Sequence, residues 1–155
     1  MSDLDSENRR EALEREVAEL RQRLFELESS RSDLARSVLR DSEERFRAIF
    51  ETALDSVFVK DLHLRYTHVN SAVAKLFGRP ASELIGVTDE DLFDEEIVAR
   101  VREMDRQVLR GEVVEAVNTS VIGGMEHIFH TVKVPLRDVD GEVTGLCGIA
   151  RDITE

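Results

Sequence analysis

The first forty residues carry apolar side chains at a helical spacing. Steps of four and three residues, with one step of seven, separate Leu13, Val17, Leu20, Leu24, Leu27, Leu34 and Val38. This pattern is an a/d heptad seam in which Arg31 replaces one apolar residue. Valine at a with leucine at d favours two strands when the helices are parallel. Residues 1–40 are therefore predicted to form a parallel coiled coil that makes the chain a homodimer.

The charges beside the seam agree with a parallel pair. Matching each g position with the e position five residues on in the partner gives Arg9 with Glu14, Glu16 with Arg21, and Arg23 with Glu28. All three pairs are attractive. The alternative is an amphipathic helix that packs on its own domain.

A second helical stripe follows the seam, at Phe46, Ile49, Phe50 and Ala53. The heptad phase does not reach Phe46, and Asp41 with Glu44 has the spacing of a capping box. We therefore predict a break or a stutter near residues 39–42, with a second domain over residues 42–155.

From Ser56 the pattern changes to short runs of β-type residues. Two runs at 57–61 and 65–70 precede two short helical segments, a longer helical segment at 94–111, and three more runs at 113–122, 127–136 and 143–150. Strands and helices in this order predict an α+β domain with a five-stranded antiparallel sheet.

Three segments of this domain resemble the PAS sensory domain family: "VKDLHLRYTHVN", "LFGRPASELIGVTDEDLF" and "KVPLRDVDGEVTGLCGIARDIT". The resemblance covers about residues 42–155. It implies the PAS fold with sheet order 2-1-5-4-3, a small-molecule pocket between sheet and helices, and dimerisation through N-terminal helices. It also implies that Asp152, Ile153 and Thr154 connect the last strand to an output helix. Such helices commonly lead into a histidine kinase, a cyclic-dinucleotide enzyme or a transcription activator.

Apolar residues of the strands and short helices are the candidate lining of such a pocket. On the fourth strand, His130 shares a face with Ile128 and Val132, and this face is predicted to point inward. The full candidate set is Val57, Val59, Val69, Val73, Leu76, Phe77, Leu84, Leu92, Phe93, Val101, Met104, Val121, Ile128, His130 and Val132. Each of them is more often simple core, and a PAS domain can be filled and act without a ligand.

The charge balance argues against a polyanionic partner. The net charge is -12, from 33 acidic and 21 basic residues, whereas proteins that bind nucleic acids or anionic membranes need Lys and Arg. No apolar run is long enough to span a bilayer, and the N-terminus is unlike a signal peptide, so we expect a cytoplasmic protein. The single cysteine, Cys147, excludes an internal disulfide and a multi-cysteine metal site.

Catalytic and cofactor signatures are missing from the sequence. It holds no phosphate-binding loop, nucleophile elbow, zinc helix or kinase signature, so the chain is not expected to be an enzyme. Light-sensing PAS domains need an Asn-Cys-Arg stretch where "GVTDEDLF" stands here, and haem-binding relatives often use a histidine of the long helix, which residues 94–111 lack. We therefore predict no cofactor, although an unidentified small molecule can still occupy the pocket.

The acidic run at 88–96 lacks the spaced ligands of a calcium loop. We interpret Thr88 and Asp94 as helix caps, and no metal site is predicted. The sequence as a whole predicts a PAS sensor or relay module of a signalling protein, most often a two-component histidine kinase. The alternatives are a PAS scaffold that only sets dimer geometry and, less favoured, a haem- or flavin-bearing sensor.

Overall fold

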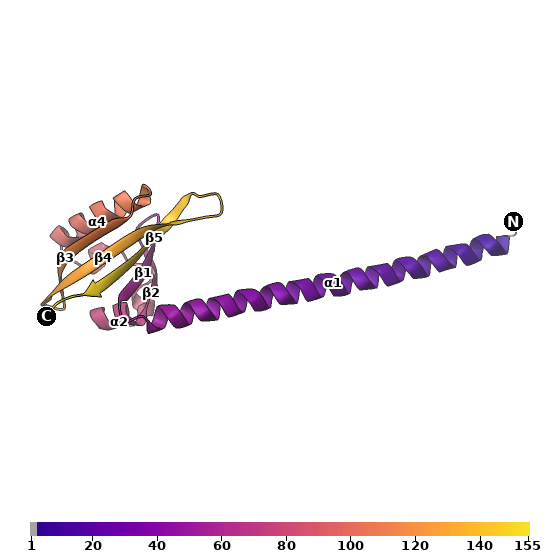
Figure 1. Cartoon of the computed structure of the whole chain (residues 1–155), viewed down its shortest axis with the longest axis horizontal. Helices are drawn as coiled ribbons and strands as arrows, with labels where there is room; N and C mark the ends of the chain where they lie inside the picture. Colours follow the sequence, from indigo (N-terminus) through magenta and orange to yellow (C-terminus); the bar gives the residue numbers. More distant parts are fainter. Residues whose placement is uncertain (1–2) are drawn as a thin grey trace. The chain divides into compact units, whose positions relative to one another are not determined.

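The computed structural model describes residues 3–155 and divides the chain into a helical unit and a globular unit (Figure 1). Helix α1 spans Asp3–Thr52, and its last turns belong to the globular unit, which begins at Arg47. The helix is continuous through residues 39–42, which excludes a break there and leaves the other predicted alternative, a stutter of the heptad phase within an unbroken helix. No glycine or proline occurs in α1, and without a helix-breaking residue the backbone continues through the change of stripe.

The heptad seam of α1 is uncovered in the single chain. Its seven apolar residues are all exposed, from 44% at Val17 to 68% at Leu27. Helices of this length normally bury an apolar stripe, because tertiary or quaternary packing supplies most of their stability.

Five antiparallel strands form the sheet of the globular unit, in the order β2-β1-β5-β4-β3. The strands are β1 (Ser56–Asp61), β2 (Tyr66–Val69), β3 (Val114–Ile122), β4 (Met125–Arg137) and β5 (Val143–Asp152). The order and the antiparallel pairing confirm the fold expected from the sequence. Strands β1 and β5 lie side by side at the centre, so the first and last strands of the domain are neighbours (Figure 1).

The helices between β2 and β3 pack on one face of the sheet. They are α2 (Ser71–Phe77), α3 (Ala81–Leu84), the 3₁₀ helix η1 (Asp89–Asp91) and α4 (Glu95–Leu109), of which α4 contacts β3, β4 and β5. Tyr66, Val69, Val73 and Leu84 form a buried apolar cluster at the β2, α2 and α3 side. Below, the helix-covered face of the sheet is called the inner face, and the opposite face the outer face.

Local sequence explains where these short helices begin and end. The Asn70 side chain accepts a hydrogen bond from the backbone N–H of Val73 and so caps α2, which ends at Gly78 in the left-handed conformation (φ 62°). The predicted cap Thr88 forms a capping box with Asp91. Asp94 occupies the N-cap position of α4 but makes no side-chain cap hydrogen bond.

Gly148 of β5 lets an aromatic ring cross the inner face. A Cβ atom at this position would lie 2.2 Å from Cζ of Phe58 on the neighbouring strand β1. Only glycine leaves room for the ring, and Phe58 thereby reaches the space between sheet and helices.

Within residues 3–155, no helix has both the length and the apolar composition needed to cross a membrane.

Candidate functional site

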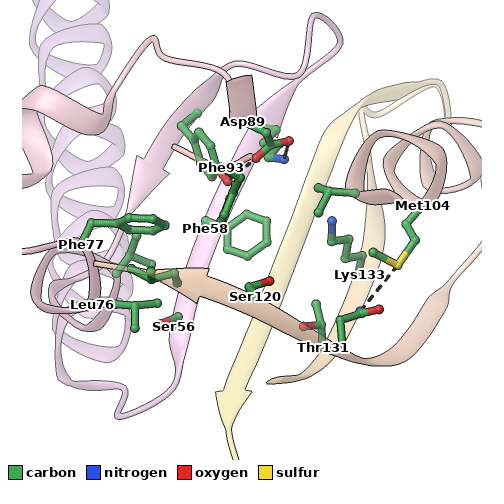
Figure 2. Close-up of a pocket in the computed structure, with 16 residues that line it drawn as sticks. Ser56, Phe58, Leu76, Phe77, Asp89, Phe93, Met104, Ser120, Thr131 and Lys133 are labelled. Carbon is green, nitrogen blue, oxygen red and sulfur yellow. Dashed lines mark hydrogen bonds and ion pairs between the residues drawn. The ribbon is translucent and has the colours of Figure 1, made fainter. Parts of the chain in front are cut away.

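The inner face of the sheet and the helices enclose a small cavity of about 80 Å³ (Figure 2). Strand β1 contributes Phe58 from one side, while α2 and the segment after η1 contribute Phe77 and Phe93. The complete lining is Ser56, Phe58, Lys60, Tyr66, Val73, Leu76, Phe77, Asp89, Phe93, Val101, Met104, Asn118, Ser120, Ile122, Thr131 and Lys133. The lining therefore combines an aromatic and aliphatic surface with a group of polar side chains.

Four charged side chains form a buried network on this wall. Lys60 Nζ donates to Asp89 Oδ2 at 2.6 Å and to Asp105 Oδ2 at 2.7 Å. Lys133 Nζ donates to the other oxygen of the same carboxylate, Asp105 Oδ1, at 2.5 Å. The side chains of Lys60 and Asp105 are fully buried, and those of Asp89 and Lys133 are 6% and 4% exposed. The network thus joins β1, η1, α4 and β4.

Tyr66 of β2 completes the network, because its hydroxyl donates to Asp89 Oδ1 at 2.6 Å. Burial raises the pKa of this phenol well above its usual value, and the nearby carboxylate of Asp89 raises it further. Burial lowers the pKa of Lys133, partly offset by the attraction of Asp105. Two lysines face two aspartates, so the formal charges of the network cancel.

Such a network fixes geometry more than it adds stability. A buried ion pair loses the hydration of both charges and often does no better than apolar residues of the same volume. Removing one member, however, leaves a buried charge without its partner. The four side chains therefore hold their elements in one arrangement around the cavity.

Two hydroxyl groups face the cavity without a partner in the described part of the chain. Ser120 of β3 and Thr131 of β4 are each 8% exposed and line the cavity, and neither side chain makes a hydrogen bond to residues 3–155 (Figure 2). Lys133 uses one of its three donors for Asp105, and no other acceptor within these residues contacts it. The cavity wall therefore has unused hydrogen-bonding capacity.

The fifteen residues proposed as pocket lining from the sequence divide into three groups. At the cavity lie Val73, Leu76, Phe77, Phe93, Val101 and Met104. In or against the neighbouring apolar cluster lie Val69, Leu84 and Leu92. On the outer face lie Val57, Val59, Val121, Ile128, His130 and Val132.

The inward facing predicted for His130, Ile128 and Val132 is wrong by one residue. The side chains that alternate with them on β4, Phe129, Thr131 and Lys133, are the buried ones. His130 instead lies beside β3, with Nε2 2.6 Å from Glu115 Oε1 at the surface. The error arose because the outer face of β4 carries more aliphatic residues than the inner face.

The sequence interpretation missed Lys60, Asp105 and Lys133, for which signals existed. Asp105 stands four residues after Val101 and three before Val108, so it lies on the apolar stripe of α4. Lys60 and Lys133 are two of the three lysines in the chain, and each interrupts a run of β-type residues. Charged residues at core positions indicate a buried pair, because an unpaired charge is seldom buried.

The terminal Asp152, Ile153 and Thr154 are tied to the start of β4. Asp152 Oδ1 accepts hydrogen bonds from the backbone N–H of Thr154 at 2.9 Å and from its hydroxyl, and Asp152 Oδ2 lies 2.8 Å from His127 Nδ1. The hydroxyl oxygen of Thr154 accepts from the N–H of Ile128 at 2.8 Å. The pKa of Asp152 is lowered, most by the hydrogen bonds from Thr154 and to a smaller extent by the contact with His127.

Comparison with known proteins identifies the domain. A family model described as the PAS fold matches residues 50–155. The chain belongs to the PAS family. The PAS domain of a protein from Colwellia psychrerythraea has the same fold, with a TM-score of 0.63 and 19% identity, covering 72% of this chain and 96% of that one.

Two further proteins are similar to this PAS chain. The methanogenesis regulatory histidine kinase FilI of Methanothrix harundinacea is 50% identical over 115 residues, which are 74% of this chain and 13% of the kinase. The structure described as VqmA bound to DPO has a TM-score of 0.63 and 25% identity, covering 68% of this chain and 56% of that one. The chain thus spans a small part of the length of the kinase that it matches. These similarities support a sensory role in signalling.

Proposed function

We propose that this chain is the sensor module of a signal-transduction protein, dimerised through α1 and acting on a histidine kinase region through Asp152, Ile153 and Thr154. The observation that carries the proposal is the 50% identity with FilI, whose name describes a regulatory histidine kinase. A PAS domain lacks catalytic machinery of its own, so the kinase activity would belong to another part of the natural protein.

The exposed seam of α1 supports dimerisation. Seven apolar residues at heptad spacing lack cover in the single chain, and burying such a stripe contributes roughly 25 cal/mol for each Å² removed from water. Attractive e and g charges favour the parallel arrangement. A parallel dimer would bring two PAS domains and two outputs together, as kinases that phosphorylate within a dimer require.

The position of the terminal element supports its role as the relay. Asp152 and Thr154 are hydrogen-bonded to the first residues of β4, and Ile153 N–H donates to Ile128 O at 2.8 Å. Strand β4 also carries Thr131 and Lys133, which line the cavity. A change at the cavity can therefore reach the terminal element along one strand.

The second candidate function is a scaffold without a ligand, in which the PAS domain only sets the geometry of the dimer. The small volume of the cavity and the buried network beside it favour this alternative. In that case no small molecule would change the output, whereas the seam and the terminal element would still be required.

A kinase fusion tests the proposed function. The full chain is joined through Glu155 to the dimerisation and catalytic regions of a histidine kinase, and autophosphorylation is measured. We expect Leu20→Asp in the seam to lower the activity strongly, while Ala18→Asp at an outer b position of α1 leaves it unchanged. Activity that is equal in wild type, both variants and the isolated kinase regions would overturn the proposal.

A further inference from the structure

We propose that the free edge of strand β3 is an interaction surface for a second copy of this chain, whose own β3 pairs with it antiparallel and centred on Val117. The five-stranded sheet then continues from one copy into the other. This contact uses neither the cavity nor the α1 seam. It rests on the proposed dimer only because that dimer brings a second copy close to the first.

Alternate residues of β3, the last strand in the sheet order, point their backbone groups away from the sheet. Thr119 of β3 stands opposite Ile128 of β4. The N–H of Ile128 donates to Thr154 Oγ1 and its carbonyl accepts from the N–H of Ile153, so Thr119 and Ile128 are not hydrogen-bonded to each other. Hydrogen-bonded and non-hydrogen-bonded positions alternate along an antiparallel pair. The residues whose N–H and C=O groups face the free edge are therefore Glu115, Val117, Thr119 and Val121.

The chain covers one edge of the sheet and leaves the other open. In the four-residue strand β2, the N–H of Tyr66 donates to Val87 O at 3.0 Å, and Tyr66 O accepts from the N–H of Gly86 at 2.7 Å. The nine-residue strand β3 contains no proline, lysine or register shift. Within residues 3–155, its free edge receives one hydrogen bond, from Arg100 Nη2 to Thr119 O at 2.6 Å. A long open edge is a template for a further strand, and proteins normally shield such edges.

The side chains along this edge complement those of a second copy. Val113, Val117 and Val121 are 66%, 62% and 43% exposed in the single chain. With Val117 opposite the partner's Val117, Val121 lies opposite the partner's Val113, so apolar side chains meet. The same register sets Glu115 opposite the partner's Thr119, whose carbonyl the partner's Arg100 contacts. Opposite charges are thus brought together and no like charges face each other, which selects a second copy as the partner.

A disulfide cross-link tests the register. In a Cys147→Ser background of the full chain, Val117→Cys is expected to form a linked pair on mild oxidation, because paired Cα atoms lie about 5.5 Å apart, within disulfide reach. Thr119→Cys is the control and should not bridge, because its two copies lie about 14 Å apart along the strands. A yield at Thr119→Cys equal to or above that at Val117→Cys, or no bridge at either position, overturns the pairing. The bridge reports β3 alone, whereas the mass of the unoxidised chain reports the α1 seam, so the two proposals fail separately.

Amide hydrogen exchange tests the hydrogen bonds of the edge in the full chain. In the wild type, the amides of Glu115, Val117 and Thr119 are expected to exchange about tenfold more slowly, or slower still, than the amide of the fully exposed Val139, after correction for sequence. Val117→Lys should remove this protection, because two ammonium groups then lie opposite each other at the centre of the pair. Val134→Lys makes the same change on the outer face of β4, where the valine is 36% exposed, and should leave the protection unchanged. Unprotected edge amides in the wild type, or equal protection in the two variants, would overturn the pairing.

Discussion

Arg151 Nη2 lies 3.0 Å from Asp55 Oδ2, and Arg151 Nε lies 3.2 Å from both oxygens of the same carboxylate. The pair joins the end of β5 to the short segment between α1 and β1. Arg151 directly precedes Asp152, and the carbonyl of Asp55 accepts from Asn70 Nδ2 at 3.0 Å. The segment that follows α1 and the terminal element of the domain are therefore linked by two side chains.

Replacing Asp55 with asparagine should loosen this link without unfolding the domain. Because Arg151 is well exposed, the ion pair adds little to global stability, and the melting temperature should be nearly unchanged. Amide hydrogen exchange at residues 149–152 should become faster, because the side-chain restraint on the end of β5 is lost. Asp140→Asn, in the β4–β5 turn, is the control and should leave these rates unchanged. Unaltered exchange in Asp55→Asn would contradict the restraint.

The buried network predicts a large cost for removing its central carboxylate. Asp105→Asn would leave Lys60 and Lys133 without their shared acceptor charge, and we expect the free energy of unfolding to fall by about 3–5 kcal/mol. Urea unfolding followed by circular dichroism measures it. Glu103→Gln makes the same kind of change on the exposed side of α4 and should have little effect. Equal stability of the two variants would show that the network is not buried as described.

Tyr66 predicts a loss of stability in alkali. Its pKa in the folded protein is raised well above its ordinary value, mainly by burial and further by the carboxylate of Asp89. Above about pH 10 the unfolded chain therefore loses a proton that the folded chain retains, and stability falls as pH rises. Lys133 changes the stability in the opposite direction. Burial lowers the pKa of Lys133 in the folded protein, so between the folded and the unfolded pKa of this lysine the unfolded chain holds more protons, and stability rises with pH there.

A direct titration separates the two groups. The chain contains one tyrosine and no tryptophan, so tyrosinate absorbance reports Tyr66 alone. We expect tyrosinate to form only as the circular dichroism signal of the fold is lost. The Tyr66→Phe variant has no phenol to ionise, so its stability should not show this fall. The difference in free energy of unfolding between wild type and Tyr66→Phe should therefore become smaller above about pH 10. A phenol that titrates near pH 10 in the folded protein would contradict the burial of Tyr66.

The order of strands could be read from the sequence because strand-forming runs and turns are local features. The face that each strand turns inward could not, since the outer face is itself apolar. On β4, Ile128, Val132 and Val134 face outward, whereas Thr131 and Lys133 face the core. Counting aliphatic residues chose the wrong side, and a shift of one residue inverts every facing on a strand.

The sequence predicted the apolar part of the candidate site, which depends on local spacing, and missed the charged part, which depends on the fold. Helical spacing identified Val73, Leu76, Phe77, Val101 and Met104, which do line the cavity. The charged wall was missed, because Lys60, Asp89 and Asp105 are far apart in sequence and only the fold brings them together. A charged residue on an apolar stripe, such as Asp105, is the signal that would have pointed to the network.

The seam of α1 predicts a parallel dimer. Leu20→Asp places a charge at a d position and should convert the chain to monomer at micromolar concentration, because an unpaired buried charge is costly. Ala18→Asp, at a b position two residues before it, should remain dimeric. Sedimentation equilibrium distinguishes the two masses. A wild-type chain that sediments as a monomer would rule out the seam as a dimer interface.

Cross-linking tests the direction of the helices. In a Cys147→Ser background, Leu20→Cys should form a disulfide-linked dimer on mild oxidation, because equal positions meet across a parallel seam. Ala18→Cys, on the outside of the coiled coil, should cross-link much less. An antiparallel pair would bring residue 20 opposite a different position in most registers. Absence of the Leu20→Cys bridge in a proven dimer would therefore indicate the antiparallel arrangement.

The terminal element predicts a variant that keeps the fold and changes the output. Asp152 accepts hydrogen bonds from Thr154 and lies 2.8 Å from His127 Nδ1, so Asp152→Ala removes these contacts, while the hydrogen bonds of Ile153 and Thr154 to Ile128 remain. Exposed contacts of this kind contribute roughly 1 kcal/mol or less, too little to unfold a domain of ordinary stability.

The same free energy is large for a signalling equilibrium. A change of about 1 kcal/mol shifts the balance between two arrangements of an output segment several-fold. In the kinase fusion, Asp152→Ala should therefore alter autophosphorylation several-fold, while thermal melting and dimer mass stay close to wild type. Asp140→Ala, an exposed aspartate in the β4–β5 turn, should leave all three unchanged. If Asp152→Ala and Asp140→Ala gave the same kinase activity as the wild type, Asp152 would not belong to the relay, because the contacts it makes would then have no bearing on the position of the output.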